Sequence, residues 1–243
     1  MSNVYLVTGA TSDVGLALLR RIFRPGDTLI AQGGKNLSLL ADLCRENPGR
    51  VHTYSVDLSD DTATRLFITD VLAGCPLPTH IIHLPALRVM NTRFRSFDEA
   101  RFEEDFSVQV RSAILICRAF LPKMAKAGRG RVLFMQSSYA LGAPPKNVSA
   151  YVVAKSALGG LAKSLAVEYA ASGITVNMVA PCMMETRFLA DTPDLIVQAA
   201  AASNPMGRNA RVEDVVPAMA FLLGEDAGFI TGVTLPVTGG AAL

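Results

Sequence analysis

The segment Val4-Tyr5-Leu6-Val7-Thr8-Gly9-Ala10-Thr11-Ser12-Asp13-Val14-Gly15 decides the fold of this chain. A β-rich run leads directly into a glycine turn, and the turn leads into a helical pattern. A strand, turn and helix start of this kind point backbone N–H groups and the positive end of a helix dipole at one place, where a phosphate group can bind. Gly9 permits the tight turn and Gly15 permits a close approach of the helix, because neither has a Cβ atom.

The same alternation of short β-rich runs with longer helical patterns continues along the chain. We expect strands at 4–8, 28–32, 51–56, 80–84, 131–136, 175–179 and 234–237. We expect helices at 14–23, 37–45, 63–73, 97–124, 150–171, 186–201 and 212–223. The pattern predicts an α/β protein with a single domain over residues 1–243, a doubly wound (Rossmann) fold whose seven-stranded parallel sheet carries helices on both faces. The irregular stretch around 183–210 is predicted to be a substrate lid.

The composition excludes several other classes of protein. Half of the 243 residues are hydrophobic and 18% are charged, which is enough apolar material to cover both faces of a buried sheet. The net charge of +2 comes with no basic run, so we expect no nucleic-acid partner. No apolar stretch reaches the roughly 20 residues of a membrane span, and no signal segment is visible, so we expect a cytoplasmic protein without a membrane partner. We expect no metal site, because the spacing of the cysteines and histidines is not that of metal ligands: Cys44, Cys75, Cys117, Cys182, His52, His80 and His83.

A second motif carries acid–base chemistry. Tyr151 and Lys155 are four residues apart at the start of a predicted helix, so they share one face of it. A phenol ionises with a pKa near 10, and a fixed cation beside it lowers the cost of ionisation. The pair is common on ordinary helices, but here it follows the run Gln136-Ser137-Ser138 and precedes the run Ile174-Thr175-Val176-Asn177-Met178-Val179-Ala180-Pro181. This order resembles that of the short-chain dehydrogenases/reductases, and the resemblance implies a tyrosine that exchanges a proton, a lysine that supports it and a serine that binds the substrate oxygen.

With these motifs the chain resembles the short-chain dehydrogenases/reductases, and its pattern is closest to the 3-oxoacyl-[acyl-carrier-protein] reductases. Thr8, Gly9 and Gly15 match the family's TGxxxGxG fingerprint, and the resemblance extends from Val4 to Gly240. It implies an NADP(H)-dependent oxidoreductase that transfers a hydride between nicotinamide and a ketone or secondary alcohol. A 3-oxoacyl thioester or polyketide-like compound is the substrate class that this resemblance favours.

Two of the implied catalytic positions leave alternatives open. Counting forward from Gly130 favours Ser137 as the catalytic serine, whereas counting back from Tyr151 favours Ser138, and we favour Ser137. Gln109 stands where family members often have an asparagine that supports a proton relay behind the lysine. Glutamine keeps the amide but moves it by one methylene group, so a relay role and a structural role are equally open.

The resemblance also implies a set of cofactor-binding residues. No carboxylate follows the second strand, and Lys35 there can pair with the 2′-phosphate of NADP(H), although it is equally open that Lys35 is a solvated loop lysine. Asp57 and Leu58 resemble the family's adenine-contacting pair. The full implied set is Gly9, Thr11, Ser12, Asp13, Val14, Gly15, Lys35, Asp57, Leu58, Leu84, Pro85, Tyr151, Lys155, Pro181, Met184 and Thr186.

Besides Gln109, the chain departs from the family pattern at three further places. Asp13 replaces the middle glycine of the fingerprint, and we expect its side chain to cap the following helix. The run His83-Leu84-Pro85-Ala86 replaces NNAG, which removes side-chain amides that tie strands together. Cys182 replaces a glycine near the expected nicotinamide position. Together these changes indicate a divergent member of the family.

The sequence also bears on two alternative functions and on the assembly state of the chain. An NADP(H)-binding sensor or assembly partner with weakened catalysis is the alternative function, and retention of Tyr151 and Lys155 argues against it. Epimerases and dehydratases of nucleotide sugars share the fold and the YxxxK motif, but the 243-residue length argues against that assignment. Apolar residues surround much of the helices at 100–124 and 150–171, and the resemblance implies a homodimer or homotetramer that covers them.

Overall fold

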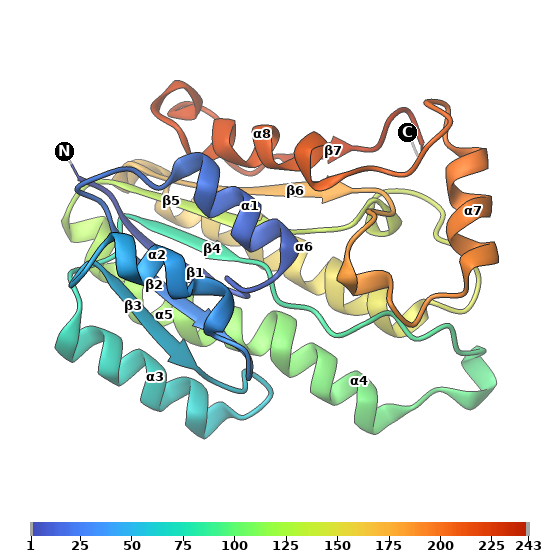
Figure 1. Ribbon diagram of the computed structural model, residues 1–243, viewed down its shortest axis with the longest axis horizontal. Coiled ribbons are helices and arrows are strands. Elements are labelled where there is room, and N and C mark those ends of the chain that lie inside the picture. The colour runs from blue at the N-terminus through green and yellow to red at the C-terminus, as the bar shows by residue number, and fades with distance from the viewer. Residues whose placement is uncertain (1, 242–243) are drawn as a thin grey trace.

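The computed structural model describes residues 2–241, and its strands form one parallel sheet in the spatial order β3-β2-β1-β4-β5-β6-β7 (Figure 1). The order runs outward in both directions from the junction of β1 and β4, which is the arrangement of a doubly wound sheet. The predicted fold class is confirmed. The strands are β1 (Val4–Thr8), β2 (Thr28–Gly33), β3 (Val51–Ser55), β4 (His80–His83), β5 (Gly130–Met135), β6 (Ile174–Pro181) and β7 (Thr234–Val237).

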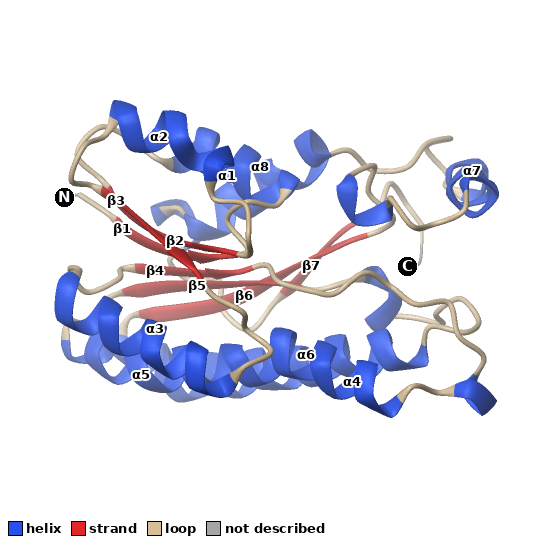
Figure 2. Cartoon of the chain, turned by 60° about the horizontal axis from the view of Figure 1, so that its bottom comes forward, coloured by secondary structure: helices blue, strands red, loops and turns tan. Residues whose placement is uncertain are grey.

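Helices cover both faces of the sheet (Figure 2). On one face lie α1, α2 and α8, and on the other lie α3, α4, α5 and α6, whereas α7 stands beyond the carboxyl end of β6. The helices are α1 (Asp13–Ile22), α2 (Ala41–Glu46), α3 (Asp61–Gly74), α4 (Glu99–Phe106), α5 (Ser112–Lys126), α6 (Ser149–Tyr169), α7 (Asp194–Ser203) and α8 (Val212–Leu223). Because successive strands are parallel, all their carboxyl ends reach the same edge of the sheet.

Each central strand places alternate side chains in two separate cores, since side chains alternate between the faces of a strand. One face packs on α3, α5 and α6 through Leu6, Ile30, Ile81, Val132 and Val176. The opposite face packs on α1 and α8 through Val7, Ala31, Ile82, Leu133 and Val179. Burial of both faces explains why the strands have nearly continuous apolar sequences.

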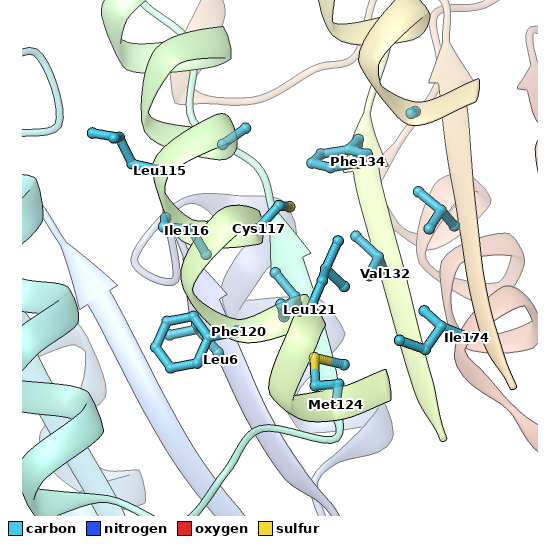
Figure 3. Packing of buried hydrophobic residues seen from close by; sticks show 14 of the residues in the cluster. Leu6, Leu115, Ile116, Cys117, Phe120, Leu121, Met124, Val132, Phe134 and Ile174 are labelled. Carbon is cyan, nitrogen blue, oxygen red and sulfur yellow. The ribbon is translucent and has the colours of Figure 1, made fainter. Parts of the chain in front are cut away.

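The core on the α5 side is shown in Figure 3. Phe120 and Met124 of α5 are fully buried, with Phe120 beside Leu6 of β1 and Met124 on the side of Ile174 of β6 (Figure 3). The close packing fixes α5 on the sheet, and its amino-terminal end therefore lies at the carboxyl edge of the strands.

One predicted helix is divided in the structure. The helix expected at 97–124 consists of α4, a π-helical turn at Ser107–Arg111 and α5. Since a π turn adds a single residue to the local repeat, the apolar spacing did not reveal it. The turn carries Gln109, and π turns are frequent at functional sites.

Two other helices are shorter than expected. The helix predicted at 186–201 is a 3₁₀ turn at Arg187–Leu189 followed by α7, which begins only after Pro193. Proline limits the residue before it to extended conformations, so the helix cannot continue backwards through this position. The helix predicted at 37–45 is likewise a 3₁₀ turn followed by the short α2.

None of the helices within residues 2–241 is both long enough and apolar enough to cross a bilayer. The same residues hold no group of three or more histidine, cysteine or acidic side chains arranged to bind a metal ion.

Candidate active site

Three of the predicted catalytic residues meet at the carboxyl edge of the sheet. Tyr151 and Lys155 lie on the first turns of α6, and Ser137 lies two residues after the end of β5. The Ser137 side chain lies near enough to the Tyr151 hydroxyl to lower the pKa of that phenol by hydrogen bonding. The adjacent Ser138 is 2% exposed and begins a 3₁₀ turn. The tertiary structure therefore brings Ser137, rather than Ser138, to the phenol.

Lys155 is held in place by burial and by one short hydrogen bond. Its side chain is 1% exposed, and Nζ donates to the carbonyl oxygen of Met135 at 2.7 Å. The same Nζ lies 5.6 Å from the centroid of the Tyr151 ring. Burial lowers the pKa of Lys155 to about 8, and the negative charge of Asp105 opposes this shift. Most of the lysine is still charged at neutral pH.

The Tyr151 phenol differs from the sequence-based expectation. Burial raises its pKa above the ordinary value, the hydrogen bond from Ser137 lowers it, and the charge of Asp105 raises it again. The net lowering of the pKa that the sequence led us to expect is therefore absent in this arrangement, because burial is the largest cause and raises the pKa, while the ammonium of Lys155 donates to the Met135 carbonyl. The phenol is protonated at neutral pH.

A buried acid that the sequence analysis did not identify supports Gln109. Asp105 Oδ2 accepts a hydrogen bond from Gln109 Nε2 at 2.7 Å, and Asp105 Oδ1 accepts one from the backbone N–H of Leu87 at 2.9 Å. Gln109 is fully buried, and its Oε1 has no hydrogen-bond partner among residues 2–241. The Asp105 carboxylate fixes the orientation of the Gln109 amide, and Gln109 Oε1 is left as a buried acceptor for a hydrogen-bond donor in the site. The helical spacing of four residues between the two was the available sequence signal.

His83 corrects another expectation. Its Nε2 lies 2.9 Å from the carbonyl oxygen of Gln109, and its Nδ1 lies 2.7 Å from Thr8 Oγ1. A carbonyl only accepts, so Nε2 carries the proton and Nδ1 accepts from the threonine hydroxyl. The loss of strand ties expected from the missing amides is therefore wrong, because the imidazole connects β4 to β1 and to the π turn.

The glycine turn has the predicted geometry. Gly9 has a φ of +70°, and a Cβ atom on it would lie 3.3 Å from Leu84 Cβ and from Pro85 N, so Leu84 and Pro85 pack directly against the turn. A Cβ atom on Gly15 would lie 2.6 Å from the carbonyl oxygen of Ala10, which shows how closely α1 approaches. These contacts require glycine at both positions.

Asp13 does not cap α1, which is a further correction. The cap is Ser12, whose Oγ accepts from the backbone N–H of Gly15 at 3.0 Å. The Asp13 carboxylate instead binds Arg187, which comes from the segment after β6. Ser12 can cap because it precedes the first helical residue, whereas Asp13 is already within the first turn. No local pattern in the sequence points to this role of Arg187.

The ends of β2 and β3 carry the predicted adenosine-side residues. Gln32 is buried there, and its Oε1 accepts from the backbone N–H of Gly9 at 3.0 Å. Lys35 is exposed, and its charge contributes to a lowered pKa of Asp57, whose main cause is a hydrogen bond from Ser59. Leu58 is buried beside them. This end of the sheet therefore presents an exposed cation and a neutral amide.

The segment after β6 starts at the expected nicotinamide end. Met184 pairs with Ala210 in an isolated parallel bridge, and Thr186 opens the 3₁₀ turn that carries Arg187. Cys182 Sγ lies 3.7 Å from Asn204 Nδ2. The side chain that replaces the family's glycine is thus engaged with the carboxyl end of the predicted lid.

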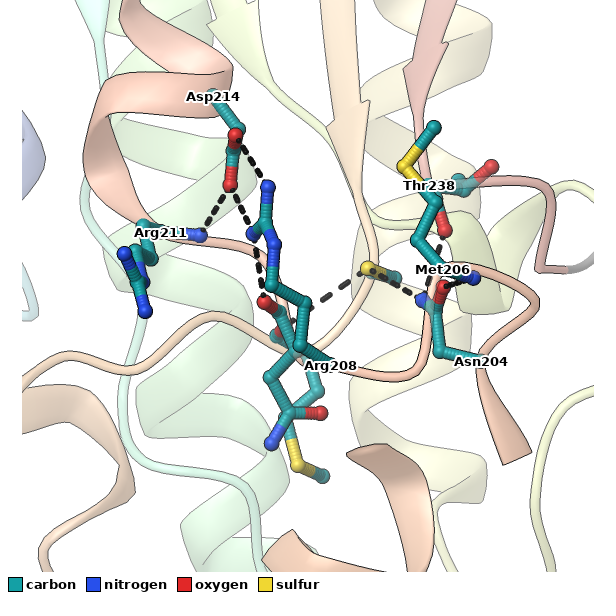
Figure 4. A network of polar contacts seen from close by, with 9 residues as sticks. Asn204, Met206, Arg208, Arg211, Asp214 and Thr238 are labelled. Atoms are coloured by element: carbon teal, nitrogen blue, oxygen red, sulfur yellow. Dashed lines mark hydrogen bonds and ion pairs between the residues drawn. The ribbon is translucent and has the colours of Figure 1, made fainter. Parts of the chain in front are cut away.

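A polar network anchors the carboxyl end of the segment 183–210, the predicted lid (Figure 4). Asn204 Nδ2 donates to the carbonyl oxygen of Thr238 at 2.9 Å, and Asn204 Oδ1 accepts from the backbone N–H of Met206. Arg208 donates twice to the Asp214 carboxylate, at 2.6 and 2.9 Å, and lowers the pKa of that carboxyl. The two ends of the segment are therefore fixed, while α7 between them contributes no buried residue to the core.

The observed residues fit a nicotinamide dinucleotide. The glycine turn, the amino end of α1 and an exposed Lys35 lie on one side of the β1–β4 junction, and the Ser–Tyr–Lys group lies on the other. Backbone N–H groups at a helix start bind phosphates, and a positive φ at Gly9 allows the backbone to approach them. The chemistry of these donors is that of a dinucleotide site.

Fold and site together define the class of α/β oxidoreductases that act with a nicotinamide dinucleotide and a Ser–Tyr–Lys group. A family model described as enoyl-(acyl carrier protein) reductase matches residues 9–242. The chain belongs to this family of short-chain dehydrogenases/reductases.

Relatives of known activity differ in their substrates. The chain is 33% identical to the 2-(R)-hydroxypropyl-CoM dehydrogenase of Xanthobacter autotrophicus, over 98% of each protein. It is 27% identical to the 3-oxoacyl-[acyl-carrier-protein] reductase of Pseudomonas aeruginosa, over 98% of this chain and 96% of the relative. The resemblance to this family, found first in the motifs, is confirmed.

Solved structures agree with the fold. A protein assigned as an NAD(P)-dependent gluconate 5-dehydrogenase from Beutenbergia cavernae, with NADP bound, is 27% identical and has a TM-score of 0.89, over 98% of this chain and 96% of that chain. A 3-ketoacyl-(acyl-carrier-protein) reductase from Brucella melitensis, complexed with NADH, has a TM-score of 0.87 at 24% identity, over 99% of this chain and 98% of that chain.

Proposed function

We propose that this protein reduces a ketone to a secondary alcohol with NADP(H), through Tyr151, Lys155 and Ser137. The observation that carries the proposal is the convergence of these three side chains at the carboxyl edge of the sheet, beside the glycine turn. A binding module has no need for a buried phenol paired with a serine and a lysine.

Each residue has a defined task in this chemistry. The bound nicotinamide supplies a hydride to the carbonyl carbon. Tyr151 donates its phenolic proton to the carbonyl oxygen, and the raised pKa that keeps this phenol protonated suits a proton donor. Ser137 donates a hydrogen bond to the same oxygen as negative charge develops on it. Lys155 places a positive charge near the phenol and favours its ionised form after proton transfer.

Two observations support NADP(H) over NAD(H). Gln32 and not a carboxylate occupies the buried end of β2, so no acidic side chain at that position is available for a ribose 2′-hydroxyl. The exposed Lys35 follows it and can pair with a 2′-phosphate. We propose a 3-oxoacyl thioester or a polyketide-like ketone as the substrate class, because the reductase relatives include 3-oxoacyl reductases.

The proposal is tested by Tyr151→Phe, with Tyr169→Phe at the far end of the same helix as the control. NADPH and NADH oxidation is followed with a panel of 3-oxoacyl thioesters and cyclic ketones. We expect Tyr151→Phe to lower kcat on the order of 10²- to 10⁴-fold, since it removes the proton donor, and to leave NADPH affinity within about twofold. The control keeps its activity. Unchanged turnover in Tyr151→Phe contradicts the proposal and favours the alternative of a dinucleotide-binding sensor or assembly partner.

We also propose that the protein is a homodimer or homotetramer. Its support is the exposure of apolar side chains on α5 and α6: Ile114 is 41% exposed, Val153 is 50% exposed and Val167 is 83% exposed. Apolar side chains clustered on packed helices are typical of subunit interfaces. Light scattering coupled to gel filtration measures the mass, and a monomer at micromolar concentration contradicts the proposal.

A further inference from the structure

An ion pair that has no part in the proposed proton chemistry joins the glycine turn to the segment after β6. Arg187 Nε donates to Asp13 Oδ1 at 2.6 Å, and the backbone N–H of Arg187 donates to Asp13 Oδ2 at 2.7 Å. Arg187 Nη2 also donates to the carbonyl oxygen of Thr11 at 3.0 Å. One residue therefore makes three hydrogen bonds to the turn.

The pair is poorly placed to stabilise the fold. The Arg187 side chain is 56% exposed and the Asp13 side chain is 28% exposed, and ion pairs at such positions contribute little to folding. The two residues lie 174 positions apart in the chain and connect the first turn of α1 to the short 3₁₀ turn after β6. Any effect of the ion pair is therefore confined to the glycine turn and to the segment that carries Arg187.

The charge of Asp13 creates a problem that the arginine solves. Asp13 occupies the first turn of α1, and the amino end of that helix is the part of the site suited to a phosphate. A carboxylate there competes with the phosphate for the positive end of the helix dipole and repels it. The Arg187 guanidinium makes the net charge of the pair zero.

The same pair also fastens the lid. Arg187 lies in the 3₁₀ turn Arg187–Leu189, and a few residues later Asp191 forms an ion pair with Arg88 from the loop after β4. The segment is thus tied to both sides of the β1–β4 junction. A cleft of 570 Å³ is lined by Asp13 together with residues of the segment itself, among them Thr186 and Arg187.

We propose that Arg187 is the counter-charge that lets a dinucleotide phosphate bind beside Asp13, and that the Asp13–Arg187 pair latches the segment after β6 over the glycine turn. This inference rests on the proposed function for the identity of the phosphate ligand. The pair explains how the chain can carry Asp13 where the family has a glycine, although a lone carboxylate there would oppose phosphate binding. Arg187 is then a positioning residue.

The charge part is tested with four proteins: the unchanged chain, Arg187→Gln, Asp13→Asn and the double variant. The net charge of the pair is then zero, −1, +1 and zero, respectively, because each substitution removes one charge. NADPH affinity is measured by fluorescence titration at low salt. We expect Arg187→Gln to raise Kd on the order of tenfold, Asp13→Asn to lower it several-fold, and the double variant to return it to within about threefold of the unchanged chain. High salt should reduce these differences.

Two results overturn the charge part. One is a double variant that binds NADPH as weakly as Arg187→Gln, because the effect of Arg187 on NADPH binding would then be independent of the Asp13 charge. The other is an Asp13→Asn variant that weakens binding as much as Arg187→Gln. If the unchanged chain binds neither NADPH nor NADH, the proposed function fails and the charge part fails with it.

The latch part has a readout that needs no cofactor. Hydrogen–deuterium exchange is measured over residues 183–193 without nucleotide. We expect Arg187→Gln and Asp13→Asn to accelerate exchange there several-fold. Arg88→Gln serves as the matched control: it breaks the other ion pair of the segment, so it should also accelerate exchange but leave NADPH affinity within about twofold. If Arg187→Gln leaves the exchange rate over residues 183–193 unchanged, the proposal that the ion pair holds this segment is wrong, regardless of the NADPH affinities.

Discussion

Acidification should unfold this protein through two buried neutral histidines, and His83 is the clearer of them. His83 is 1% exposed and uses both ring nitrogens in hydrogen bonds, to Thr8 and to the backbone of Gln109. Burial lowers its pKa to about 3, and the positive charge of Lys155 adds to this shift. Burial similarly lowers the pKa of His80 to about 4.

The sign and size of the effect follow from proton linkage. Unfolding releases each histidine to its ordinary pKa near 6.5, so the unfolded chain binds protons that the folded chain rejects as the pH falls below that value. The stabilisation is complete above about pH 6.5 and is lost as the pH falls toward the folded-state values of about 3 and 4. Between about pH 7.5 and pH 5 each histidine should cost about 2 kcal/mol of unfolding free energy, which follows from the ratio of protonated to neutral imidazole in the unfolded chain.

The assay is urea unfolding followed by circular dichroism at these two pH values and at a fixed protein concentration. His83→Asn keeps a side-chain donor and acceptor but removes the titrating group, so its loss of stability between the two pH values should be about 2 kcal/mol smaller than that of the unchanged chain. Comparison of the differences cancels the contribution of other groups. His80→Asn is the matched control and should give a similar reduction. Equal pH dependence in His83→Asn and in the unchanged chain would refute the reasoning.

Two further predictions concern the packing and the electrostatics of the site. A Cβ atom on Gly159 would lie 2.7 Å from Gln136 Nε2, whereas a Cβ atom on Gly160 would meet nothing within 4 Å. Urea unfolding should therefore show that Gly159→Ala lowers the free energy of unfolding by about 1–3 kcal/mol and that Gly160→Ala raises it by about 0.5–1 kcal/mol. Equal effects of the two substitutions would contradict the packing described for Gly159. The negative charge of Asp105 raises the pKa of Lys155, and Asp105→Asn removes that charge. The alkaline limb of the plot of kcat/KM against pH should therefore move to lower pH in this variant. A limb that does not move would show that the Asp105 carboxylate has no electrostatic effect on the ionisation of Lys155.

Local sequence was sufficient for the elements and for one pair of site residues. Strands β1 and β7 and helix α8 have the predicted bounds, since apolar period and end signals are properties of neighbouring residues. Tyr151 and Lys155 were recognisable because a spacing of four places two side chains on one face of any helix. These features depend on the backbone repeat, which the sequence specifies directly.

The tertiary structure decided the contacts between segments that are distant in the chain. The sequence favoured Ser137 over Ser138 by one of two competing counts, and the turn after β5 is what brings Ser137 to Tyr151. The pairing of Asp13 with Arg187 overrode the local preference of an aspartate for capping. Such contacts depend on how the strands are ordered and on which charges then meet, and an ion pair between distant segments leaves no periodic signal in the sequence.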